Sequence, residues 1–163
     1  MVIFKKIPEE LDGFDGDLVI SIVGKDEVPL RATNAWLDWR LYGNLGELVS
    51  RRVFQCEVGE RCMLPTYSKF KFDRLILVGG GHLFKESSLP DSKQGREHWF
   101  EIFKHVEEIT RSLKVEKFGL SLPRYENSAQ EKALLEILKS SSLPEKTFLF
   151  LCRAASFSKA LGA

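Results

Sequence analysis

The chain has few cysteines, and their number is odd. Cys56, Cys62 and Cys152 are the three cysteines among 163 residues, and they do not have the spacing of a metal site. Cys56 and Cys62 flank an expected turn and could lie near each other. Disulfides are rare in the cytoplasm, so we interpret all three cysteines as reduced thiols of a cytoplasmic protein.

Long apolar runs are also missing. No window approaches the roughly 18 apolar residues of a membrane helix. The first 17 residues, MVIFKKIPEELDGFDGD, contain an apolar run of four residues before the lysines. A secretory signal needs about 7–15 apolar residues. We therefore expect a cytoplasmic protein that does not span a membrane.

An excess of charge of either sign is the third absence. The chain has 24 basic and 23 acidic residues, which gives a net charge of +1. This balance offers no electrostatic argument for binding to nucleic acid or to an anionic membrane. Hydrophobic residues make up 44% of the chain and charged residues 29%, as in ordinary globular proteins. The length predicts a single domain over residues 1–163.

Short apolar segments alternate with helical patterns along the chain. The apolar segments predict strands over residues 17–24, 74–80, 117–123 and 147–153, with a further edge strand over residues 2–7. Their nearly continuous apolar character is typical of strands that helices cover on both faces. The predicted fold class is therefore α/β, with three α/β/α layers around a mixed sheet.

Three helices are predicted between these strands. The first covers residues 35–52, with Thr33 or Asn34 as its cap and with leucines at positions 37, 41, 45 and 48. The second covers residues 96–114, with one stripe formed by Trp99, Phe103, Val106 and Leu113. The third covers residues 129–142 and is capped by Ser128. Residues 52–70 instead predict an antiparallel hairpin with its turn at residues 58–60.

The glycine run after the 74–80 strand is the main candidate for a ligand contact. A phosphate site needs a glycine turn followed at once by a helix. Here residues 82–95 intervene, and the pattern matches neither GxGxxG nor a P-loop. One interpretation is a tight turn at a strand end, and the other is a ligand site in which His82 is an acid, a base or a phosphate contact.

A ligand of an open α/β sheet lies beyond the carboxyl ends of its strands. This rule nominates three loops, with the candidate ligand-binding residues Gly24, Lys25, Gly79, Gly80, Gly81, His82, Arg124 and Tyr125.

No catalytic residues and no metal ligands are assigned from the sequence. A G-x-S-x-G elbow is missing, and His98 and His105 are seven residues apart on one predicted helix, too far for a zinc pair. We interpret these two histidines as surface or packing residues. Trp36, Trp39 and Tyr42 recur at a spacing of three. They could stack a base, but a core or a subunit contact is the favoured interpretation.

A family resemblance is carried by a series of short motifs in a fixed order. They are Leu37-Asp38, residues 43–45, Phe54, Gly59-Glu60 and residues 78–81. Over roughly residues 15–155 the chain resembles the N-terminal domain of the leucyl aminopeptidases of peptidase family M17. The resemblance implies a macro-domain-like fold. It also implies that the zinc ions and the catalytic residues belong to a separate C-terminal domain, whose Asn-Thr-Asp-Ala-Glu-Gly-Arg signature does not occur here.

The resulting functional prediction is a non-catalytic module for protein interaction, assembly or regulation. We expect a homo-oligomer or a protein partner, no cofactor, and no peptide hydrolysis. The alternative is binding of ADP-ribose or a related nucleotide, as in macro domains. The segment TNAW at residues 33–36 is a poor match to their Asn-Ala-Ala-Asn run, and SLPRYENS at residues 121–128 lacks the glycine of their diphosphate loop. An enzyme of unknown reaction is the third hypothesis.

Overall fold

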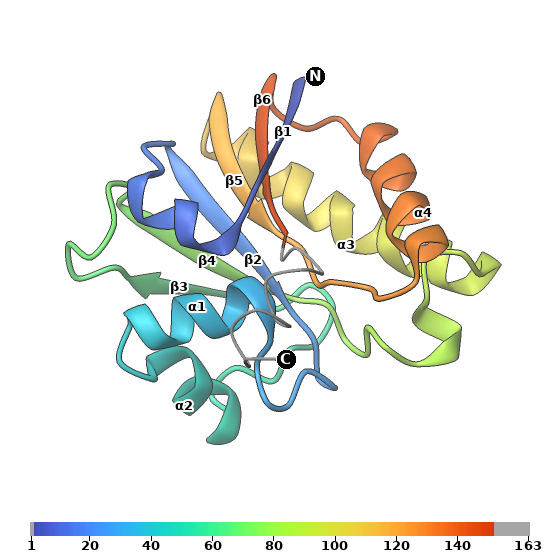
Figure 1. Ribbon diagram of the computed structural model, residues 1–163, viewed down its shortest axis with the longest axis horizontal. Helices are drawn as coiled ribbons and strands as arrows, with labels where there is room; N and C mark the ends of the chain where they lie inside the picture. Colours follow the sequence, from blue (N-terminus) through green and yellow to red (C-terminus); the bar gives the residue numbers. More distant parts are fainter. Residues whose placement is uncertain (1, 152–163) are drawn as a thin grey trace, which may run out of the picture.

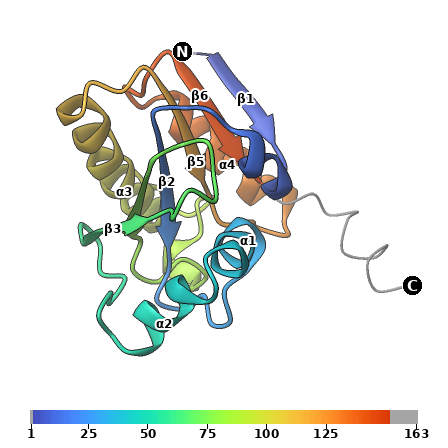
Figure 2. The same ribbon diagram turned by 90° about the vertical axis from the view of Figure 1, so that its left-hand side faces the viewer.

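The computed structural model describes residues 2–151, and a six-stranded mixed sheet forms its centre. The strands are β1 (Val2–Lys6), β2 (Leu18–Val23), β3 (Arg61–Pro65), β4 (Arg74–Gly79), β5 (Lys117–Ser121) and β6 (Lys146–Phe150). Their order is β1-β6-β5-β2-β4-β3, and Figure 2 shows β1 and β3 at opposite sides of the sheet. Within this sheet β3 runs antiparallel to β4, and the other neighbours are parallel.

Helices cover both faces of the sheet. They are α1 (Ala32–Arg40), α2 (Asn44–Ser50), α3 (Lys93–Ser112) and α4 (Ser128–Lys139), with 3-10 turns η1 (Pro8–Gly13) and η2 (Glu86–Ser88). Figure 1 shows α1 and α2 on one side of the sheet and α3 and α4 on the other. Alternate residues of β2 pack into the two layers: Ile20 lies in the cluster with α3 and α4, and Val19 in the cluster with α1 and α2.

This architecture confirms the predicted α/β fold with three layers and a mixed sheet. All six residues of β2 are buried, which is the property that the continuous apolar pattern predicted. The edge strand near the amino end is also present, since β1 pairs with β6 alone among the described strands. The last predicted strand, 147–153, is seen as β6, and its residues 152–153, with Cys152, lie outside the described residues.

The predicted hairpin over residues 52–70 is wrong. Only its second half is a strand, β3, and the partner of β3 is β4. Cys56 has a φ of 59°, which is a left-handed conformation that interrupts an extended chain. The carboxylate of Glu60 accepts hydrogen bonds from the amides of Gln55 and Glu57 at 3.0 and 3.1 Å. These amides are therefore satisfied by a side chain instead of a neighbouring strand.

The predicted single helix over residues 35–52 is also wrong. It is divided into α1 and α2 at Tyr42 and Gly43, whose φ values are 58° and 80°. Thr33 and Asn34 do not cap α1, because Arg31 occupies the N-cap position, without a side-chain capping hydrogen bond. The side chains of Thr33 and Asn34 are buried in the protein. The stripe predicted for the second helix ends one member early, because Leu113 follows the end of α3 and is 36% exposed.

Candidate functional site

The three nominated loops meet beyond the carboxyl ends of β2, β4 and β5. β2, β4 and β5 are adjacent and parallel, so the loops that follow them lie side by side. The amide of Lys25 donates a hydrogen bond to the carbonyl of Gly81 at 2.8 Å, which joins the first loop to the second. The hydroxyl of Tyr125 donates to the carbonyl of Leu83 at 2.7 Å, which joins the third loop to the second.

The side chain of Asp26, in the loop after β2, binds two successive backbone amides of the loop after β4. Its carboxylate oxygens accept hydrogen bonds from the backbone amides of Leu83 at 2.9 Å and Phe84 at 2.8 Å. Successive amides of this kind form an anion-binding concavity. The bound anion here is therefore a side chain of the protein itself. Sequence reasoning missed Asp26, because its partners are 57 and 58 residues away.

The glycines at residues 79–81 allow neighbouring segments of the chain to pack closely. A Cβ at Gly79 would lie 2.0 Å from the carbonyl oxygen of Glu57, so a larger residue has no room there. Gly81 has a φ of 63°, and its amide donates to the carbonyl of Cys56 at 2.7 Å. The carbonyl of Gly80 is 2.6 Å from Nε2 of His98 on α3. These contacts fasten the turn after β4 to the 53–60 loop and to α3.

The remaining nominated residues have different surroundings. Lys25 forms an ion pair with Glu57. His82 is half-buried, and its Nδ1, which has no hydrogen-bond partner, is 3.9 Å from the carboxylate of Asp26. Tyr125 is buried, and burial raises the pKa of its hydroxyl well above the usual range. Arg124 is half-buried beside it.

Phe84 completes the contact between these loops. Its ring lies 5.7 Å from the ring of Tyr125 in an edge arrangement, and the Arg31 guanidinium lies over it at 5.6 Å. Arg31 belongs to the loop before α1, so all three loops contribute to this small cluster.

A chain of buried polar groups runs from β2 to the loop before α1. The hydroxyl of Ser21 donates to the side-chain oxygen of Asn34. The side-chain amide of Asn34 donates to the carbonyl of Ile22 at 3.0 Å and to the carboxylate of Glu27 at 2.8 Å. Burial raises the pKa of Glu27 to about 7, and the Asn34 hydrogen bond opposes this rise. Sequence reasoning missed the buried carboxyl group of Glu27, because an acidic residue in a loop after a strand is usually solvated.

Glu27 also lies at the wall of a hollow between the 27–30 loop, α1 and α2. The hollow has a volume of about 800 Å³. Trp39 and Tyr42 form part of its lining, and they are 67% and 75% exposed. They are therefore not core residues, and a subunit contact remains a prediction for them.

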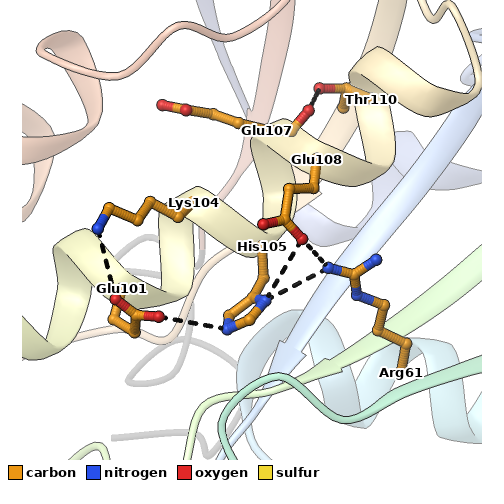
Figure 3. Close-up of polar contacts among 7 residues, drawn as sticks. All are labelled: Arg61, Glu101, Lys104, His105, Glu107, Glu108 and Thr110. Carbon is orange, nitrogen blue, oxygen red and sulfur yellow. Dashed lines mark hydrogen bonds and ion pairs between the residues drawn. The ribbon is translucent and has the colours of Figure 1, made fainter.

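His105 takes part in a polar cluster on the side of α3 that faces Arg61 of β3 (Figure 3). Its Nδ1 is 3.3 Å from a guanidinium nitrogen of Arg61, which also donates to Glu108 at 2.6 Å. Hydrogen bonding to Arg61 holds the pKa of the Glu108 carboxyl below its usual value. Within residues 2–151 no group of three or more acidic, histidine or cysteine side chains is placed to hold a metal ion. In the same part of the chain no helix is long and apolar enough to cross a membrane.

Comparisons with known proteins identify the fold class. No protein-family model matches the sequence, and no curated protein matches it. Among solved structures, the macrodomain of Thermus aquaticus DarG is similar with a TM-score of 0.59 at 10% identity, over 92% of this chain and 98% of that chain. An Oceanobacillus iheyensis macrodomain with ADP is similar with a TM-score of 0.62 at 8% identity, over 94% and 85%.

A tomato leucine aminopeptidase mutant is also similar, with a TM-score of 0.55 at 17% identity. The match covers 97% of this chain and 34% of that chain, so this chain spans about a third of the aminopeptidase's length. At these identities the similarities establish the fold alone. The protein has a macro-domain-like α/β fold.

Proposed function

We propose that the protein is a non-catalytic module that works by assembly with further copies of itself, in the manner expected of an aminopeptidase N-terminal-like domain. The observation that favours this proposal over nucleotide binding is the closed turn after β4. The carboxylate of Asp26 accepts the hydrogen bonds of the Leu83 and Phe84 amides, so these donors are already occupied. The backbone of the neighbouring loop packs directly against Gly79. An external phosphate would have to displace these groups.

Exposed apolar side chains support the same proposal. In the described part of the chain, the large aromatic or apolar residues with more than half of their surface exposed are Val2, Val28, Trp39, Tyr42, Val53, Met63 and Tyr67. Tryptophan, tyrosine and methionine are enriched where proteins bind one another. Single exposed apolar residues are ordinary, but clusters of them mark interaction surfaces.

Nucleotide binding is the second candidate. The observation that favours it is the fold shared with a macrodomain solved with ADP. The loop after β5 offers no glycine between Leu122 and Ser128 to approach a diphosphate.

Sedimentation velocity over a wide range of protein concentration tests the assembly proposal. We expect a species of at least twice the 18.6 kDa chain mass, with its population increasing with concentration. Apolar contacts are not screened by salt, so the assembly should persist at high ionic strength. A protein that sediments as a monomer at every concentration would contradict the proposal.

A further inference from the structure

β3 is an edge strand, and its outward backbone groups form no ladder with the described residues: the Met63 carbonyl has a weak contact at 3.9 Å from the Cys62 thiol. Within residues 2–151 it pairs with β4 and with no other strand. The amide of Gly79 donates to the carbonyl of Glu60 at 2.9 Å, and hydrogen-bonded pairs alternate along an antiparallel ladder. The backbone groups of Cys62 and Leu64 therefore point to β4, while those of Arg61 and Met63 point away from the sheet.

The features that usually prevent an edge strand from pairing with another chain, charged residues and proline, are weak in β3. A charged side chain on an edge strand discourages pairing. Arg61 is the one charged residue of β3, but its guanidinium turns toward α3, where Glu108 and His105 hold it (Figure 3). Pro65 lacks an amide hydrogen and protects only the end of the strand.

Met63 gives the open edge an apolar surface. Its side chain is 59% exposed at the middle of β3. Tyr67, just beyond the end of the strand, is 61% exposed, and Val58, just before its start, is 36% exposed. The net charge of +1 means that two copies of the chain repel each other little.

We propose that β3 pairs antiparallel with β3 of a second copy of this chain, about a two-fold axis at Cys62. This inference rests on the assembly function proposed above and names its surface. In this register Arg61 of each copy faces Met63 of the other, and each pair exchanges two backbone hydrogen bonds. All outward amides and carbonyls of these two residues are then satisfied. A register centred on Met63 would place Pro65 opposite Arg61 and leave the Arg61 carbonyl without a donor.

The proposed register brings two copies of Cys62 together. They would form a non-hydrogen-bonded pair, in which Cα atoms are about 4.5 Å apart, within the range of about 4.4–6.8 Å that a disulfide spans. Cys62 is half-buried, whereas Cys56 is buried. A thiol-specific cross-link at Cys62 therefore reports this register.

The test is oxidation with diamide, which takes two electrons and two protons from each pair of thiols. The full chain is expected to give a covalent dimer on a non-reducing gel, and the Cys152→Ser control should give the same dimer. The Cys62→Ser variant should give none. A dimer that persists in Cys62→Ser, or that fails to form in the unsubstituted chain, would overturn the β3 pairing.

A second variant tests the hydrogen bonds of the edge. Met63→Pro removes an amide that points away from β4, so it leaves the donors to β4 in place. We expect this variant to sediment as a monomer. If the unsubstituted chain and Met63→Pro assemble equally and Cys62 does not cross-link, the β3 surface is wrong and the assembly function stands. If the unsubstituted chain is always monomeric, the assembly function itself is wrong.

Discussion

The Val78→Asp variant is expected to accumulate as insoluble, unfolded protein. Val78 is completely buried in β4, between β2 and β3, and belongs to the cluster that α3 covers. An unpaired charge at such a position costs several kcal/mol. Stabilities of whole domains are about 5–15 kcal/mol, so this single change removes much of the total. Soluble yield and urea-induced unfolding measure the effect.

Val53→Asp is the matched control for this change. Val53 precedes β3 and is 65% exposed, so the same substitution should change the free energy of unfolding by less than about 0.5 kcal/mol. A soluble Val78→Asp protein that unfolds cooperatively with near-normal stability would show that β4 is not a central strand.

The Glu27→Gln variant is expected to make the protein more stable above pH 7 and to leave it nearly unchanged below pH 4.5. Burial raises the pKa of Glu27 from 4.5 to about 7. As the pH rises through this window, the unfolded chain loses the proton first, so the folded state loses stability. The loss amounts to roughly 3 kcal/mol once the folded carboxyl has also ionised. Glutamine keeps a carbonyl oxygen for the Asn34 amide and does not titrate.

Urea unfolding at a series of pH values measures this difference. Glu97 is exposed on α3, so Glu97→Gln serves as the control and should follow the pH profile of the unsubstituted protein. A Glu27→Gln variant whose stability falls between pH 4.5 and 7 as steeply as that of the unsubstituted protein would show that Glu27 does not cause the pH dependence.

The strands were predictable because burial on two faces leaves a direct mark in the sequence. LVISIV of β2 and RLILVG of β4 are apolar apart from Ser21 and Arg74, and both strands have a neighbour on each side in the sheet. The errors arose where local conformation depends on distant partners. Nothing local indicates that Cys56 adopts a left-handed conformation while its carbonyl accepts the amide of Gly81. The leucine spacing continued across Gly43, which concealed the break between α1 and α2.

The candidate site shows the same division. The rule for carboxyl ends of parallel strands brought three loops together from residues far apart in the sequence, and those loops do meet. Their ability to bind a ligand stays a prediction. The positions of two carboxyl groups in the loop after β2 were not predictable. Asp26 and Glu27 are ordinary loop acids in the sequence, and only tertiary contacts give them amide partners and a buried environment.

The measurement that tests the central claim most directly is a thermal melt with increasing ADP-ribose. If the turn after β4 is closed by Asp26, millimolar ADP-ribose should leave the melting temperature unchanged. A ligand at one hundred times its dissociation constant would instead add about 2.7 kcal/mol, or roughly 5–11 °C for a domain of this size. A dose-dependent rise of this kind would contradict the account and make nucleotide binding the leading function.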